Sequence, residues 1–247
     1  MARRYSSIAA AVIGAVAVWI GIFLLLSASP LDRAAAAPTV SELHVCKVGC
    51  AYTAVQTAID AAAIGDEIKI ASGIYTDVVN RAGLWQIAYI TRSIALRGGF
   101  TPTNWLTPDL SLNPVTLDAR AAGRVIYVGP GLAVSLEGLN LVQGASAGNG
   151  GGIYSASPLT LTQASVISSA SGGYGGGVYA LSGLTLSNTT LSADTAITGG
   201  GGAYVGGDLV VTGGRFISNT VSGQFGAGGG ANGRDDVGGA VPRIDGD

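Results

Sequence analysis

The sequence has few charged residues, and they are scarcest in its second half. Charged residues make up 11% of the 247 residues, and Glu137 is the only one from Val125 to Ala193. No Lys, Arg or His lies between Arg124 and Arg215. General acid–base catalysis needs titratable side chains in one place, so this stretch cannot supply a catalytic pair. The net charge of −2, without a basic cluster beyond the N-terminus, argues against nucleic acid as a partner.

Metal-binding side chains are equally scarce. His44 is the only histidine, and Cys46 and Cys50 are the only cysteines. Their C-x3-C spacing, without a second pair, does not match a zinc site built from four Cys or His ligands. A small disulfide between Cys46 and Cys50, with Gly49 easing the turn, is therefore favoured over two free thiols or a metal site.

Cofactor-binding motifs are missing as well. No G-x-x-x-x-G-K-[ST] segment occurs, and no helix-forming stretch follows a glycine triplet, so no cofactor is expected. The segment GGANGRDDVGG partly matches the calcium-binding nonapeptide G-G-x-G-x-D, but its glycine stands one place late and it occurs once. A Ca²⁺ site is therefore not expected there.

Glycine, in contrast, is abundant, with 40 residues. Glycine triplets begin at Gly150, Gly175, Gly200 and Gly228, so they recur after 25, 25 and 28 residues. Apolar residues keep the same spacing and alternate with polar ones, which is the pattern of half-buried strands. They form three columns: Val134, Leu159, Leu184 and Leu209; Leu136, Leu161, Leu186 and Val211; and Leu141, Val166, Leu191 and Phe216.

This repeat, without crossover helices, predicts an all-β solenoid, a single-stranded parallel β-helix in which each repeat adds one coil. Glycine suits the corners because it alone reaches positive φ at little cost. We expect the β-helix over residues 65–230, with six or seven turns. Residues 231–247 lack the aliphatic pair of a further strand, which predicts an irregular tail, a truncated chain and self-association through an uncapped last coil.

Residues 1–37 have the features of a targeting segment. Arg3 and Arg4 precede an uncharged run over residues 8–26, and alanines occupy residues 34–37. The run fits either a long signal peptide or an uncleaved membrane anchor with the arginines inside. Both interpretations predict that the rest of the chain is exported, to the cell surface or the extracellular medium.

Residues 38–64 are expected to lead into the β-helix through a short helix. The apolar residues from Val55 to Ala62 have the spacing of one helix face. Thr53 and Gln56 make a T-x-x-Q capping box at its start. Such a helix would cover the open, apolar end of the coil stack.

Two segments carry a resemblance to known families. GCAYTAVQTAIDAAAIGDEIKIASGIYTD resembles the start of secreted right-handed parallel β-helix proteins of the pectin-lyase-like superfamily. GRFISNT, with Phe216 and Asn219 as its F-x-x-N, is similar to the repeat of polymorphic outer membrane proteins. The resemblance covers roughly residues 46–231 and implies a right-handed coil. It implies either an adhesin-like binding protein or a carbohydrate-active enzyme. The enzyme would be a polysaccharide lyase with clustered carboxylates on Ca²⁺ and an Arg or Lys base, or a glycoside hydrolase with paired carboxylates.

The candidate catalytic residues are few. Asp118, Arg120 and Arg124, in LDARAAGR, could place a carboxylate beside two bases, but a solvated turn with local ion pairs is favoured. Asp194 is predicted to lie between Ser169 and Asn219 in its column, and Asp208 over Gly183. These two carboxylates and Arg215 would meet only if the register slipped. No catalytic residue is therefore assigned.

The aromatic residues offer a second kind of site. Tyr154, Tyr179 and Tyr204 are 25 residues apart and predict a ladder of rings, for which a structural stack is favoured over a ligand-stacking strip. The rings that could stack on sugars are Trp85, Trp105, Tyr127, Tyr154, Tyr179 and Tyr204. The sequence thus predicts an exported, non-catalytic surface module that binds a glycan or a surface protein, with the carbohydrate-active enzyme as the alternative.

Overall fold

The computed structural model describes residues 40–223, 231–235 and 244–245, the last two ranges by their backbone only. The predicted signal or anchor segment lies outside the described residues, as do most of the C-terminal tail and the GGANGRDDVGG motif. Within the described ranges, no helix is long and apolar enough to cross a bilayer.

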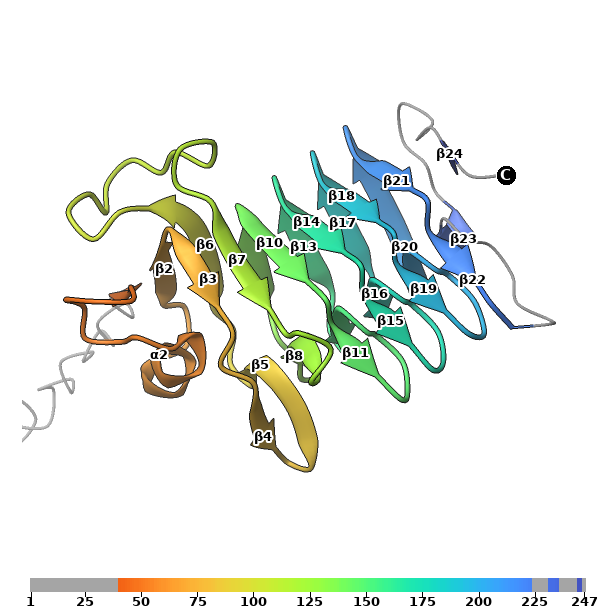
Figure 1. The fold of residues 1–247 in the computed structure, drawn as a ribbon, viewed down its shortest axis with the longest axis horizontal. Coiled ribbons are helices and arrows are strands. Elements are labelled where there is room, and N and C mark those ends of the chain that lie inside the picture. The colour runs from red at the N-terminus through yellow and green to blue at the C-terminus, as the bar shows by residue number, and fades with distance from the viewer. Residues whose placement is uncertain (1–39, 224–230, 236–243, 246–247) are drawn as a thin grey trace, which may run out of the picture. The chain divides into compact units, whose positions relative to one another are not determined.

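The chain winds into a parallel β-solenoid of about seven turns (Figure 1). Its strands form three sheets that run along the stack, and neighbouring strands in each sheet come from successive coils. One coil, for example, supplies β12, β13, β14 and β15 in turn. The 13-stranded sheet contains β1 (Glu42–Val45), β2 (Glu67–Ala71), β4 (Val79–Arg81), β5 (Leu84–Ile90), β6 (Ala95–Phe100), β8 (Arg124–Val128), β9 (Val134–Glu137), β12 (Ile153–Ser155), β13 (Leu159–Thr162), β16 (Val178–Ala180), β17 (Leu184–Ser187), β20 (Ala203–Thr212) and β23 (Ala231–Asp235).

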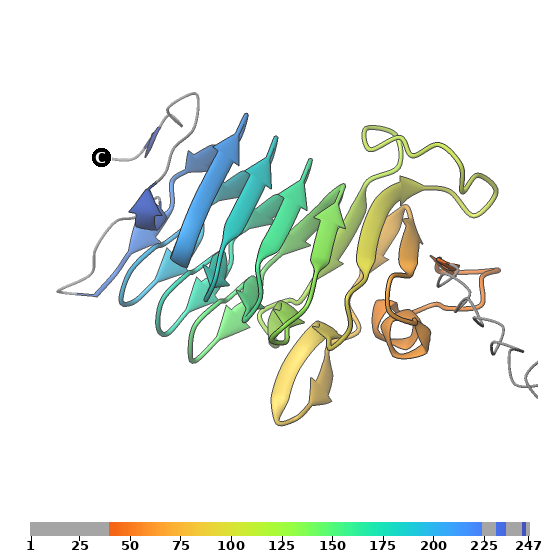
Figure 2. The ribbon, with the colours of Figure 1, turned by 180° about the vertical axis from the view of Figure 1, so that it is seen from behind.

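The other two sheets complete the coils, the four-stranded one only from residue 145 onward. The seven-stranded sheet contains β3 (Gly73–Tyr75), β7 (Val115–Asp118), β10 (Leu139–Val142), β14 (Ser165–Ile167), β18 (Thr190–Ser192), β21 (Arg215–Ile217) and β24 (Ile244–Asp245). The four-stranded sheet contains β11 (Ala145–Ser146), β15 (Ala170–Ser171), β19 (Thr195–Ala196) and β22 (Thr220–Val221). All strand pairs are parallel except β4 with β5, a hairpin that stands off the stack (Figure 2).

The strand register confirms the three predicted columns. Leu159 pairs with Leu184 and Val134, Leu161 pairs with Leu186, and equivalent pairs continue in the seven-stranded sheet. The column residues are buried, and with their neighbours they form a single apolar core inside the coils. Apolar burial is therefore repeated once per coil, as in other repeat proteins.

The glycine triplets that begin at Gly150, Gly175 and Gly200 mark the corner between the four-stranded and 13-stranded sheets. In the three triplets that the structure describes, the first glycine has a φ in the left-handed region, +68° at Gly150, +67° at Gly175 and +62° at Gly200, which favours glycine. The second allows close approach, since a Cβ at Gly176 would lie 2.3 Å from the Gly201 carbonyl oxygen of the next coil. The triplets are therefore architectural.

The predicted helix is present as α2 (Val55–Ala61), which packs against β1, β2 and β5. The predicted capping box is wrong. The N-cap is Ala54, without a side-chain hydrogen bond, and the Gln56 side chain is turned to β5, where its Oε1 accepts from the Tyr89 backbone N–H at 2.6 Å. Gln56 stabilises the contact between helix and sheet, because buried backbone groups need partners.

Candidate binding groove

Five tyrosine rings form one continuous stack along the 13-stranded sheet. Tyr154, Tyr179 and Tyr204 lie in register on neighbouring strands, as their spacing predicts. The structure adds Tyr127 and Tyr89, each in register with the next tyrosine. Ring centroids are 4.8, 5.2, 5.3 and 5.4 Å apart along the stack.

Both ring faces of the three inner tyrosines of this ladder are covered. Successive rings are nearly parallel, with interplanar angles from 2° to 21°. Each inner ring therefore has a neighbouring ring on both faces, and a sugar could stack on it only by parting the ladder. Burial raises the pKa of Tyr127 and of Tyr179. The arrangement favours a packing role for the ladder over ligand stacking.

Asp118, Arg120 and Arg124 do not form a common centre. The Asp118 carboxylate accepts a hydrogen bond from the Arg120 backbone N–H at 2.9 Å and lies 4.0 Å from its guanidinium. The Arg124 guanidinium instead donates to the Asn149 and Gly150 carbonyl oxygens. Asp118 and Arg120 make the local ion pair of a turn, while Arg124 belongs to a neighbouring corner.

A cluster of carboxylates lies on the outside of the first coils, where the side chains of Lys69 and Arg97 form ion pairs with it. Lys69 Nζ lies 2.7 Å from Glu42, and the Arg97 guanidinium lies 3.0 Å from both Glu67 and Glu137. The hydrogen bond from Lys69 lowers the pKa of Glu42, the opposite of what a general acid at neutral pH needs. Within the described residues, no three His, Cys, Asp or Glu side chains are placed to hold a metal ion.

This cluster lies beside the disulfide between Cys46 and Cys50, whose S–S distance is 2.03 Å. His44, on β1 near Glu42, stacks on Trp105 with ring centroids 4.1 Å apart. The Lys69 ammonium also donates to the Trp105 carbonyl oxygen. One face of the Trp105 ring is therefore occupied within the protein.

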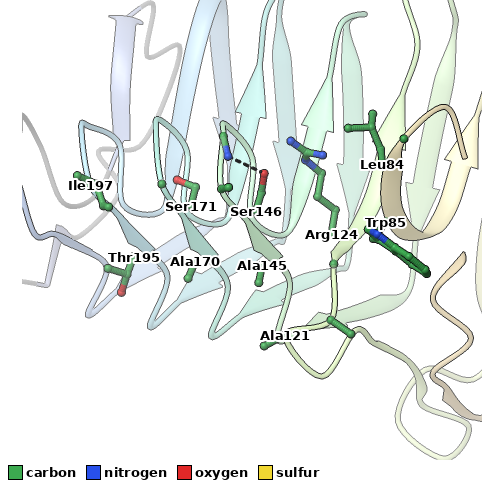
Figure 3. Close-up of a pocket in the computed structure, with 16 residues that line it drawn as sticks. Leu84, Trp85, Ala121, Arg124, Ala145, Ser146, Ala170, Ser171, Thr195 and Ile197 are labelled. Atoms are coloured by element: carbon green, nitrogen blue, oxygen red, sulfur yellow. Dashed lines mark hydrogen bonds between the residues drawn. The ribbon is translucent and has the colours of Figure 1, made fainter. Parts of the chain in front are cut away.

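An open groove of about 810 Å³ runs along the four-stranded sheet, across successive coils. Figure 3 shows its small side chains in line, with Trp85 and Leu84 of hairpin β4–β5 at one end and Ile197 at the other. Trp85 is 56% exposed. The groove is lined by Gly83, Leu84, Trp85, Ala121, Ala122, Gly123, Arg124, Ala145, Ser146, Ala147, Gly148, Ala170, Ser171, Gly172, Thr195 and Ile197.

The backbone fixes the groove's end wall. A Cβ at Gly123 would lie 2.4 Å from the Trp85 carbonyl oxygen, so the strand that carries the tryptophan packs directly on the next coil. Hairpin β4–β5 is also tied to α2 by an ion pair between Arg81 and Asp60. These contacts hold Trp85 in a defined position beside the small residues of the sheet, which preorganises the groove for a ligand.

The groove contains one ionisable side chain among its described lining residues, Arg124. Its guanidinium lies 5.6 Å from the centre of the Tyr154 ring, and burial lowers its pKa. Polar groups are otherwise uncharged: Ser146 Oγ accepts from the Gly148 N–H, while the buried Ser171 hydroxyl has no hydrogen-bond partner among the described residues. Such a lining suits binding and lacks the carboxylate pair of a hydrolase.

Two further predictions concern single residues. Asp194 lies between Ser169 and Asn219, as its column predicts. Asp208 is carried by β20 and Arg215 by β21, in different sheets. The register slip that would join Asp194 to them is absent from the described strands, since β18 pairs with β21 in the expected register.

No protein-family model, no curated protein and no solved structure matches this chain. The function must therefore be inferred from the site itself. From the sequence, Trp85 is only one of six candidate rings, because no repeat relates it to the small residues of the groove. The hairpin that places it there interrupts the 25-residue spacing.

Proposed function

We propose that this chain is an exported, right-handed parallel β-helix protein whose groove binds a neutral glycan without chemical turnover. One observation carries the proposal: an exposed tryptophan stands at one end of a long groove that contains no carboxylate among its described residues. The flat apolar face of Trp85 is suited to the C–H face of a sugar ring. In this proposal α2 caps the first coil, and residues 8–26 target the chain or tether it to a membrane.

The rest of the groove fits an extended, uncharged ligand. Its small residues recur from coil to coil, with Ala145, Ala170 and Thr195 in register. Strands in a sheet lie ~4.8 Å apart, so a linear chain lying along the groove meets similar surroundings at each coil. Arg124 adds a donor next to the tryptophan, although backbone carbonyls already engage its guanidinium.

The test combines a glycan array with a depolymerisation assay on the exported chain. We expect binding to one class of neutral glycan, weakened at least about tenfold by Trp85→Ala, because a buried aromatic contact typically contributes about 2 kcal/mol. Leu106→Ala is the matched control: Leu106 is 88% exposed on a loop outside the groove, and its removal should leave affinity unchanged. Binding that survives Trp85→Ala, or binding to proteins alone, would refute the assignment.

The alternative is a polysaccharide lyase or glycoside hydrolase. It would have to use the cluster of Glu42, Glu67 and Glu137, where Lys69 and Arg97 neutralise the carboxylates. Turnover of any polymer that is lost in Glu67→Gln, but kept in Trp85→Ala, would favour this enzyme over the binding module.

A further inference from the structure

A column of polar side chains runs through the interior of the last described coils. Ser169, Asp194 and Asn219 occupy the same position in successive coils, each at the turn that leaves the seven-stranded sheet. Each accepts a hydrogen bond from a backbone N–H of the coil before it: Ser169 from Gly144, Asp194 from Ser169, and Asn219 from Asp194. The column thus ties successive coils together through buried backbone groups.

Asn219 shows what a complete member of the column does. Its Oδ1 accepts from the Asp194 N–H at 2.9 Å, and its Nδ2 donates to the Leu191 carbonyl oxygen at 2.9 Å. Asp194 has the first bond and lacks the second. Its Oδ1 accepts from the Ser169 N–H at 2.8 Å, but its Oδ2 is buried without a partner.

The repeat identifies the missing partner. Leu191 pairs in register with Val166 of the preceding coil, so the carbonyl oxygen of Val166 is the equivalent acceptor for Asp194. An ionised carboxylate can only accept hydrogen bonds, whereas a protonated carboxyl carries one O–H donor. A proton on Asp194 would therefore supply the donor that the amide supplies in Asn219.

The surroundings compensate a charge only in part, because the hydrogen bonds from Ser169 and Ser192 that favour the ionised form are outweighed by burial. Asp194 has an exposed fraction of 0%. The groups against it are Ser169 and Ser192, Asn219, and Gly177, where an added Cβ would lie 2.5 Å from Asp194 Oδ2. None of these titrates, and no described cation pairs with the carboxylate. Burial raises the pKa of Asp194 well above its ordinary value.

We propose that Asp194 is a proton-operated latch: when protonated it closes the polar column by donating to Val166, and when ionised it loosens its coil. The coil concerned carries one end of the groove, because Thr195, the next residue, lines it. The Thr195 N–H also donates to the Ser169 carbonyl oxygen at 2.8 Å. The inference of a latch depends only on the buried polar column. Its effect on ligand binding rests on the proposed function of the groove.

The direction of the pH dependence follows from linkage. Because the folded chain holds this proton more tightly than the unfolded chain, the stabilisation is complete below about pH 4, where a free aspartate ionises. It is lost as the pH rises through the pKa of Asp194 in the folded state. The latch is therefore closed below the pKa of Asp194 in the folded state and open above it.

Hydrogen exchange followed by mass spectrometry tests the latch without any ligand. In the wild-type chain we expect protection of residues 168–177 and 190–198, corrected for intrinsic exchange, to fall at least about tenfold between about pH 4 and about pH 8, since each pKa unit is a factor of ten. Asp194→Asn should abolish this fall. Peptides from β10 are the internal control, because the coil that contains β10 has no carboxyl group in the polar column.

A matched variant and a spectroscopic signal complete the test. Asn219→Asp should create a second pH-dependent step one coil further on, and the infrared band of a protonated carboxyl should be present in the wild type and absent from Asp194→Asn. Equal pH dependence in wild type and Asp194→Asn would overturn the latch, as would a failure of Asp194→Asn to fold at neutral pH. Either result would leave the glycan proposal standing, whereas an empty glycan array would leave the latch standing.

Discussion

The tyrosine ladder leads to a quantitative prediction that separates packing from ligand binding. Tyr179 stacks on Tyr154 at 5.3 Å and on Tyr204 at 5.4 Å. Stacked aromatic pairs contribute about 0.5–1.5 kcal/mol beyond the area they bury. Tyr179→Leu keeps an apolar side chain but removes both stacks, so it should lower the free energy of unfolding by about 1–3 kcal/mol.

A double-mutant cycle isolates the stacking energy from other effects of the substitutions. For Tyr154→Leu with Tyr179→Leu, we expect a coupling free energy of about 0.5–1.5 kcal/mol. Tyr89 and Tyr204 are the matched control, because three rings lie between them and distant sites add within about 0.5 kcal/mol. Urea denaturation of the single and double variants, analysed with a common slope, gives both values.

The outcome decides what the ladder does. A coupling no larger for the adjacent pair than for the distant pair would refute the stacking argument. Tyr179→Leu should leave glycan affinity unchanged, since both faces of its ring are covered by other rings. A loss of affinity without a loss of stability would show that the ladder is a binding strip after all.

Two further predictions concern buried polar groups. Gln86 has an exposed fraction of 0%, and neither of its side-chain amide atoms has a described hydrogen-bond partner. Gln86→Met should therefore raise the free energy of unfolding by about 1–3 kcal/mol. A lower midpoint in urea would contradict this. Burial raises the pKa of Tyr75 to about 12, and its hydroxyl donates to the Ala71 carbonyl oxygen at 2.9 Å. The stabilisation that the neutral Tyr75 hydroxyl contributes should therefore persist below about pH 10 and be lost as the pH rises toward about 12. Tyr75→Phe should flatten this alkaline step in thermal melts. An unchanged step would rule out Tyr75 as its source.

Residues of the site could be placed from the sequence only where the 25-residue repeat is unbroken. Tyr154, Tyr179 and Tyr204 could be placed together because no insertion separates their coils. Tyr127 and Tyr89 join the same ladder, but 27 and 38 residues separate them from the next tyrosine, so their spacing showed no repeat. The ion pairs of Arg97 with Glu67 and Glu137 were hidden in the same way, by irregular loops in the first coils.

The sequence alone determined the solenoid. In a parallel stack, backbone pairing places residue i beside residue i+25 wherever the repeat is unbroken, so the columns, the core and the position of Asp194 between Ser169 and Asn219 follow from counting. Only the tertiary structure decided where the irregular segments go, because the β4–β5 hairpin and the loop that carries Trp105 have no partner one repeat away. Their positions depend on packing against other coils, and this packing brings Trp85 to the end of the groove.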